Sequence, residues 1–255
     1  MDYVKCGVIQ SLCAELIGTL IICGILLSGS TLISSKSYRN ETHNLQNDHE
    51  LNKLSEKSAD PSDKALAYGL TVTSVVTYTV HISGGHFNPA ITLGAIICRD
   101  ISIILGTCYV LAQIIGALIG EVLAKLIVEK KQPDQESSEF AIGVLASFML
   151  VSVYLSVTDT RKFGKDVGSA PLAVGLTITA LALSEDRISM NPAISLATSM
   201  HYEDFIYTWV DWIAPLLGGL MAGIVYRTLT KYYDLLSVRV NYSNSFVTVT
   251  ASKDN

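Results

Sequence analysis

The chain has 255 residues, of which 49% are hydrophobic and only 16% are charged. Soluble proteins carry about 25% charged residues, so the deficit indicates a lipid environment. A formal net charge of −5 offers no basic surface to nucleic acid, and we expect no such partner. The five cysteines lie in or beside apolar segments without metal-ligand spacing, which favours small buried side chains over redox or zinc chemistry. We therefore expect neither a metal nor a cofactor.

Six apolar segments are candidates for membrane spans, because a helix needs roughly 17–25 apolar residues to cross a bilayer. They comprise residues 8–28, 65–82, 101–127, 140–158, 170–184 and 207–228. Two shorter apolar segments, 88–98 and 191–200, follow the second and the fifth span. Ten residues of helix cover about 15 Å, half of an apolar core about 30 Å thick. The two short segments can therefore only enter the membrane and stop, where protein or a water-filled cavity satisfies their backbone.

Three spans with a half-helix after the second thus occur twice along the chain. An odd number of spans inverts the second copy, so the two half-helices enter from opposite faces and meet near the midplane. Inverted repeats with discontinuous helices build central sites in many transport proteins. The alternative is a six-span bundle in which Asn-Pro pairs only kink or cap helices. However, both short segments open with the same triplet, Asn-Pro-Ala, at equivalent positions of the two copies. This repetition favours an all-α membrane protein with six transmembrane helices, two re-entrant half-helices and an inverted 3+3 repeat.

The predicted organisation is a first repeat, a second repeat and a polar tail, which the family resemblance given below places in the cytoplasm, at residues 1–128, 129–236 and 237–255. Within the first repeat, residues 29–64 form a long polar loop rich in Ser, Asn, Lys and Glu. Its sequon at Asn40 suits glycosylation on an extracellular face. Three basic residues in the loop 159–169 suit the cytoplasm, although lysines in the opposite loop weaken this charge argument.

Both half-helices begin with the same triplet, in HISGGHFNPAIT and in SMNPAISLA. The residues are Asn88, Pro89, Ala90, Asn191, Pro192 and Ala193. Asn is favoured as a helix N-cap and Pro at the first helical position, while Ala leaves room for two helix starts to pack together. Two facing helix N-termini place about half a positive charge each at mid-membrane. Because Asn N–H groups can donate to a neutral solute while cations and protons are repelled, the triplets predict the narrow waist of a pore.

The chain resembles the aquaporin (major intrinsic protein) family over nearly its whole membrane region. The matching stretches are ALAYGLTVTSVVTYTVHISGGHFNPAITLGA, APLAVGLTIT and WIAPLLGGLMAGIVYR. AELIGT contains Glu15, which the family uses to hold the re-entrant loop backbone. His86 is expected to pack the same loop rather than bind a metal, with cytoplasmic pH gating as an alternative. The resemblance implies a homotetramer with one pore per subunit and both termini in the cytoplasm, and we expect a plasma-membrane protein.

The chain departs from the family around the second triplet. Ile194 stands where an Arg usually lines the outer constriction, and Ile188 stands where many relatives have the Cys blocked by mercury. Counting back from the first triplet places the aromatic Tyr68 at this constriction. On the fifth span, helix register points to Ala182 and loop spacing points to Thr179. Register is the firmer guide, so we favour Ala182 and keep Thr179 open.

These departures bear on selectivity. An Arg supplies fixed donors and a charge that repels cations, so Ile194 predicts a wider, more apolar constriction with weaker exclusion of cations and protons. Gly143 replaces a Glu that is usual in the second repeat, so the second loop loses one anchor. Ser195 and Trp212 match the water-selective branch of the family, whereas an apolar constriction favours larger neutral solutes.

Three functional hypotheses follow. The first is a passive water channel that conducts along osmotic gradients. The second is a broad-solute pore for glycerol, urea or ammonia. The third is a structural or adhesion membrane protein whose pore has decayed, motivated by the missing Arg and by Gly143. An enzyme is not expected, because Asp, Glu and His are sparse within the spans and no nucleophile–base arrangement can be assembled from their spacing.

Overall fold

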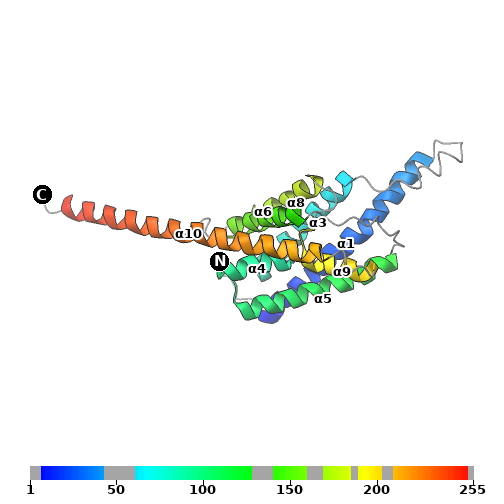
Figure 1. The fold of residues 1–255 in the computed structure, drawn as a ribbon, viewed down its shortest axis with the longest axis horizontal. Helices are drawn as coiled ribbons and strands as arrows, with labels where there is room; N and C mark the ends of the chain where they lie inside the picture. Colours follow the sequence, from blue (N-terminus) through cyan, green and yellow to red (C-terminus); the bar gives the residue numbers. More distant parts are fainter. Residues whose placement is uncertain are drawn as a thin grey trace.

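The computed structural model describes residues 7–42, 61–127, 140–159, 169–184, 189–202 and 209–251, and all regular structure in these ranges is helical. Eight helices follow one another in this described part of the chain. They are α1 (Val8–Thr42), α3 (Pro61–Ser83), α4 (Pro89–Cys98), α5 (Ile103–Ile127), α6 (Phe140–Thr158), α8 (Ala170–Ser184), α9 (Pro192–Tyr202) and α10 (Val210–Ala251). Figure 1 shows them gathered into one bundle, from which the last part of α10 projects.

Five of these helices contain segments long and apolar enough to cross a membrane. The segments are Val8–Ser28, Ser62–Ser83, Ile103–Ile127, Phe140–Thr158 and Val210–Lys231. Helix α8 covers the fifth predicted span with 15 residues, whereas α4 and α9 have only 10 and 11. Large apolar side chains are exposed on every one of the five long helices, among them Ile17, Leu70, Ile119, Leu145 and Ile224. A soluble protein rarely exposes so much contiguous apolar surface, so this outer face suits lipid.

The helix contacts of one repeat recur in the other. Helix α1 packs on α5 and on α3, and the corresponding α6 packs on α10 and on α8. The half-helix α4 packs on α10 of the other repeat, and α9 packs on α5 in return. Two contacts, α3 on α8 and α4 on α9, join equivalent helices of the two repeats. This pairing is what a two-fold relation between two repeats requires.

Small residues bring the repeats together between α3 and α8. A Cβ added to Gly69 would lie 1.8 Å from Thr179 Oγ1, and one added to Gly175 would lie 1.8 Å from Thr73 Oγ1. Each threonine hydroxyl donates to the carbonyl oxygen four residues earlier in its own helix, Thr73 to Gly69 at 2.9 Å and Thr179 to Gly175 at 3.1 Å. The two backbones can therefore approach closely without burying an unsatisfied hydroxyl, as small residues allow in membranes.

Two helices run further than their apolar segments. The sequence predicts a polar loop from residue 29 and a polar tail from residue 237, whereas α1 continues to Thr42 and α10 to Ala251. No Gly or Pro occurs in residues 31–42 or 231–251 that would stop the helix. Once a helix is nucleated, each added residue gains a hydrogen bond at little cost, so polar residues can prolong an apolar span.

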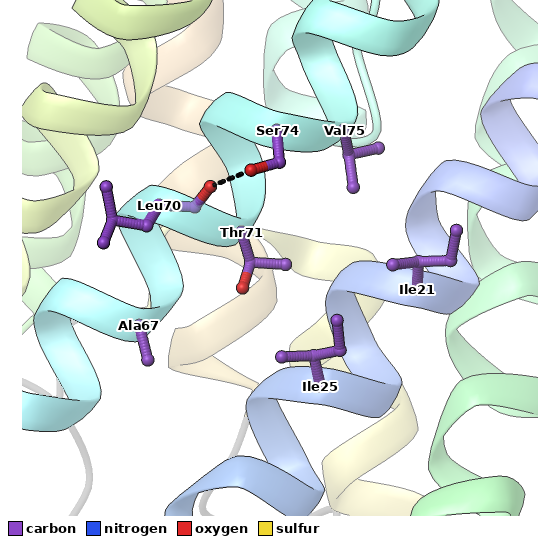
Figure 2. A pocket seen from close by; sticks show the side chains of 7 residues that line it. All are labelled: Ile21, Ile25, Ala67, Leu70, Thr71, Ser74 and Val75. Carbon is purple, nitrogen blue, oxygen red and sulfur yellow. Dashed lines mark hydrogen bonds between the residues drawn. The ribbon is translucent and has the colours of Figure 1, made fainter.

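A shallow apolar groove of about 310 Å³ lies on the outer face between α1 and α3 (Figure 2). Its lining residues are Ile21, Ile25, Ala67, Leu70, Thr71, Ser74 and Val75. The Ser74 hydroxyl turns back to donate to the Leu70 carbonyl at 2.9 Å, which leaves an apolar surface towards the groove.

Candidate functional site

The first half-helix begins at the first triplet. Asn88 is the N-cap of α4, with φ −154° and ψ 120°, and its Oδ1 accepts from the Ala90 N–H at 2.9 Å. Pro89 takes the first helical position, where a missing N–H costs nothing. The Asn88 carbonyl accepts from the Thr92 N–H at 3.0 Å and starts the helical ladder. The structure therefore has Asn88 as the helix N-cap and Pro89 at the first helical position, as the sequence predicts.

The second half-helix begins in the same way. The Asn191 Oδ1 accepts from the Ala193 N–H at 3.1 Å, and α9 starts at Pro192. The Asn191 carbonyl accepts from the Ser195 N–H at 3.1 Å. Ala90 and Ala193 are 0% and 1% exposed, so both helix starts are closely packed.

The two triplets are joined by crossed hydrogen bonds. Asn88 Nδ2 donates to the Met190 carbonyl at 2.8 Å, and Asn191 Nδ2 donates to the Phe87 carbonyl at 2.8 Å. Each amide therefore reaches the residue that precedes the other Asn, across more than a hundred residues of sequence. Both Asn side chains are buried, at 4% and 5% exposure. An amide carries two N–H donors, so one crossed bond leaves each Asn a second donor.

A buried carboxylate holds the loop before the first triplet. Glu15 on α1 is 0% exposed, and its two oxygens accept four hydrogen bonds. The donors are Ser83 Oγ at 2.6 Å, His86 N at 3.0 Å, Phe87 N at 2.7 Å and Gln113 Nε2 at 2.8 Å. A buried carboxylate is tolerated when its lone pairs are used in this way. Glu15 thus contacts the loop backbone, as the family resemblance implies.

The loop backbone held by Glu15 is unusual. Gly84, Gly85 and Phe87 have positive φ angles of 94°, 69° and 49°. Residues other than Gly rarely adopt positive φ angles, so the backbone of Phe87 is strained and is held in place by its surroundings. The bond from its N–H to Glu15 supplies part of that support, and its carbonyl is the acceptor for Asn191. The loop conformation therefore sets the position of one crossed bond.

His86 packs within this loop. Its Nδ1 lies 3.1 Å from Thr92 Oγ1, and its ring meets those of Tyr109 and Tyr154 edge to face at 5.3 Å and 5.4 Å. The two tyrosine hydroxyls donate to the neighbouring loop carbonyls of Ser83 and Gly84, at 3.0 Å and 2.8 Å. Within the described residues, no group of three His, Cys, Asp or Glu side chains could hold a metal ion.

The second loop is held differently. Gly143, at the position where the family usually has a Glu, offers no side chain to it. Instead Ser189 Oγ donates to the Asp211 carbonyl at 2.8 Å and lies 2.5 Å from Ser195 Oγ. These hydroxyls join the second loop to the first turn of α9 and to the start of α10.

The residues predicted for the outer constriction fall into two groups. Tyr68 and Ala182 are partly buried and pack against the apolar cluster that contains Ile194, which is 7% exposed. Thr179 instead lies in the contact between α3 and α8, against Gly69. Ile188 lies outside the described residues, and only the helical backbone of Asn40 is described.

Several residues of this site were not identified from the sequence. Gln113 on α5 donates both to Glu15 and to Thr92 Oγ1, the latter at 3.0 Å, and it is 0% exposed. Tyr109, Tyr154 and Ser189 hold loop or helix-start backbone. Gln113, Tyr109 and Tyr154 could have been found as polar side chains inside apolar spans, because such side chains face the interior of the bundle and have partners there.

Membrane-spanning helices that enclose two facing half-helices define a class of protein. Irregular backbone at membrane depth is tolerated only where protein or a water-filled cavity satisfies it. Discontinuous helices meeting at the interface between two repeats are the sites of membrane transport proteins. The fold and the crossed Asn residues therefore define a polytopic membrane transport protein.

Comparison with known proteins specifies the family. The model of the family described as "MIP: Major intrinsic protein" matches residues 2–226. "Aquaporin FA-CHIP" of Pelophylax lessonae is 30% identical over 184 residues, which cover 67% of each chain. "Aquaporin-1" of Sus scrofa is 30% identical over 190 residues, which cover 69% of each chain. The chain belongs to the major intrinsic protein family, the aquaporins, and the expected family is confirmed.

A solved structure supports the fold. The aquaglyceroporin from Plasmodium falciparum matches with a TM-score of 0.67 and 21% identity, over 90% of this chain and 100% of that one. Together with the helix order above, this likeness confirms the predicted all-α membrane fold with re-entrant half-helices. The protein is thus an integral, multi-pass membrane protein of a family whose members are channels rather than enzymes.

Proposed function

We propose that this protein is a passive water channel whose waist is formed by Asn88 and Asn191. The observation that carries the proposal is the pair of crossed bonds that fixes both amides at the starts of two half-helices. Each amide then has one defined orientation and one remaining N–H donor. A single file of water offers acceptor oxygens to these donors as it passes.

The same geometry opposes the passage of cations. The starts of α4 and α9 meet at the waist, and each helix N-terminus contributes about half a positive charge there. A neutral molecule accepts hydrogen bonds from the two amides, whereas a cation meets the positive potential of both helix starts. We therefore assign the main barrier to cations and protons to this waist.

We place the outer constriction at Tyr68, Ala182 and Ile194. Helix register supports this choice, and Tyr68 and Ala182 both pack against the core cluster, of which Ile194 is one of many members. The side chain of Thr179 is engaged against Gly69, which argues against the alternative assignment. With Ile194 in place of the usual Arg, we expect a wider constriction that excludes cations and protons less well.

A broad-solute pore for glycerol, urea or ammonia is the second candidate. The observation that favours it is the apolar character of Ile194 and the small size of Ala182. An apolar, wider constriction removes a fixed donor and a charge that would select against larger neutral solutes. Water remains the first choice, because Ser195 and Trp212 match the water-selective branch.

Stopped-flow light scattering on proteoliposomes tests the proposal. We expect osmotic shrinkage to be faster than in empty liposomes at equal lipid composition, and glycerol and urea uptake to be slower than water flux. Equal or faster glycerol entry would favour the second candidate. Shrinkage no faster than in empty liposomes would overturn both and favour the structural or adhesion protein.

We further propose that the chain works as a homotetramer in the plasma membrane, with both termini cytoplasmic and Asn40 glycosylated. Family membership supports the assembly, and the even number of predicted spans supports termini on one side. The proposed division is a first repeat, residues 1–128, a second repeat, residues 129–236, and a tail, residues 237–255. Glycosidase treatment of protein from a eukaryotic host should increase its electrophoretic mobility, and Asn40→Gln should abolish that change.

A further inference from the structure

The two half-helices are anchored by different chemistry. Before α4, one ionisable side chain, Glu15, accepts two loop N–H groups and two side-chain donors. Before α9, the bonds to the described part of the loop, residues 189–191, include those of the Ser189 hydroxyl and the crossed bond from Asn88 to the Met190 carbonyl. In this described part, the loop's own contribution to the anchor is therefore a neutral hydroxyl.

The packing of α6 leaves little room for a side chain in place of Gly143. A Cβ added to Gly143 would lie 3.1 Å from the Ala214 Cβ and 3.9 Å from the Ser189 carbonyl oxygen. The first distance is tighter than most Cβ contacts, so Ala214 on α10 would have to move by a few tenths of an ångström to admit a side chain. The close approach of α6 to α10 at Gly143 thus brings the start of α10 to the second loop.

Proline chemistry supplies the acceptor on α10. In an α-helix the carbonyl of residue 211 accepts from the N–H of residue 215. Residue 215 is Pro215, inside α10, and it has no N–H to donate. Ser189 Oγ donates to the Asp211 carbonyl at 2.8 Å instead. The proline therefore makes a backbone acceptor available to the loop.

The direction of the remaining bond follows from counting hydrogens. A serine hydroxyl carries one hydrogen. Because Ser189 donates to Asp211, we take Ser195 as the donor in the 2.5 Å contact, with the Asn191 carbonyl, 3.1 Å from Ser195 Oγ, as the longer second acceptor for the same hydrogen. The bonds then run from the first turn of α9, through the loop, to the first turn of α10. We call Ser195, Ser189 and the Asp211 carbonyl the serine bridge.

We infer that Ser189 is a positioning residue, which sets the place of the second half-helix, and so of Asn191 and Ile194, through the serine bridge. The inference rests on the proposed function for its effect on selectivity. Asn191 lies two residues after Ser189, and Ile194 directly precedes Ser195. A shift of the bridge moves the waist donor and the outer constriction together relative to α4.

Hydrogen exchange on the reconstituted full chain tests the anchor without requiring conduction. Ser189→Ala should raise the exchange rate of amides in residues 190–198 about tenfold, as expected for the loss of one hydrogen bond. Exchange in α4 should not change. Ser199→Ala is the matched control, because the Ser199 hydroxyl donates only within its own helix, to Ser195 O at 2.8 Å. Ser189→Thr keeps the hydroxyl and should restore protection.

A double variant separates positioning from a simple need to satisfy the Asp211 carbonyl. Pro215→Ala provides the regular helical N–H to that carbonyl, but it does not reconnect the loop to α10. We expect Ser189→Ala with Pro215→Ala to exchange as fast as Ser189→Ala alone. Recovery of wild-type protection in the double variant would overturn the inference, and so would unchanged exchange in Ser189→Ala.

The effect on selectivity is measured in the same proteoliposomes. The ratio of glycerol to water permeability should rise in Ser189→Ala and return to the wild-type value in Ser189→Thr. Faster exchange with an unchanged ratio would overturn the positioning role. If the wild-type protein conducts no water while the exchange results hold, the proposed function fails and the anchoring part of the inference stands.

Discussion

Only one short side chain can do what Asn88 and Asn191 do. In each, Oδ1 accepts the N–H of the helix start while Nδ2 donates across to the other loop. Asp offers acceptors and no donor, Gln is one methylene longer, and Ser could make one bond of each kind but would have no hydrogen left for a passing solute. The identity of the residue therefore follows from one accepted bond, one donated bond and a second donor.

Asn191→Asp tests the waist directly. The change is isosteric, but it removes the donor to the Phe87 carbonyl and introduces a negative charge where the helix ends are positive. We expect water permeability to fall and cation conductance to appear, measured by light scattering and by bilayer electrophysiology. Asn88→Asp should act in the same direction because the bonds are reciprocal. Cation exclusion equal to wild type in both variants would contradict the assignment of the barrier to the waist.

Ile194→Arg tests the outer constriction. An Arg restores a charge and fixed donors at the position where the family usually has them, so glycerol and urea uptake and proton leak should decrease. Water permeability should persist, because water can accept from the added donors. Ile194→Leu keeps an apolar side chain of equal size and serves as the control. Unchanged glycerol uptake and proton leak in Ile194→Arg would place the constriction elsewhere.

The loop before α4 depends on side chains from three different helices. Glu15 comes from α1, Gln113 and Tyr109 from α5, and Tyr154 from α6. Together they hold a backbone with three positive φ angles in a row of four residues. Such a backbone persists only when its surroundings determine it. The first half-helix is therefore placed by tertiary contacts, although its own cap is local.

Glu15→Gln tests this dependence. The amide keeps the shape but replaces one acceptor oxygen with a donor, so a loop N–H loses its partner at a cost of about 1–3 kcal/mol. Thermal unfolding in detergent should occur at a lower temperature than in wild type. Ser74→Ala is a suitable control, since that hydroxyl bonds only within α3 and lies on the outer groove. Equal unfolding temperatures for wild type and Glu15→Gln would contradict an anchoring role.

The close contact between α3 and α8 can be tested by comparing Gly69, which lies in this contact, with Gly24 on α1, which has more space around it. A Cβ at Gly69 would lie 1.8 Å from Thr179 Oγ1 and 2.4 Å from the Gly175 carbonyl, whereas one at Gly24 would meet nothing closer than 3.6 Å. Gly69→Ala should therefore separate the helices and lower the unfolding temperature. Gly24→Ala should leave it unchanged or raise it, because Ala favours a helix by about 1 kcal/mol over Gly. Similar behaviour of the two variants would refute the close approach.

The assembled bundle shows a two-fold pairing of helices with unequal chemistry at its two ends. The contacts of α1, α3, α4 and α5 recur in α6, α8, α9 and α10. The anchors do not recur, because Glu15 has no carboxylate counterpart at Gly143 and the serine bridge takes its place. Ile194, which we propose for the outer constriction, lies on the half-helix that the serine bridge anchors. The proposed exchange experiments measure this difference.

Much of the fold could be predicted because its causes are local in the sequence. Apolar length predicts the spans, and a ten-residue apolar run is too short to cross lipid. Asn followed by Pro predicts a helix start from capping chemistry alone, and α4 and α9 do begin at Pro89 and Pro192. The ends of α1 and α10 were less predictable, because both helices continue into polar residues whose composition favours neither helix nor loop.

The partners of the buried polar groups could not be predicted in the same way. Sequence patterns and the family resemblance identified Asn88, Asn191 and Glu15, since each is a local signal or a matched position. The acceptors Phe87 and Met190, the donor Gln113 and the serine bridge were decided only when helices distant in the chain came together. Their bonds depend on directions and distances of a few ångströms, which arise from the packing of helix backbones at glycines and which no spacing along the chain encodes.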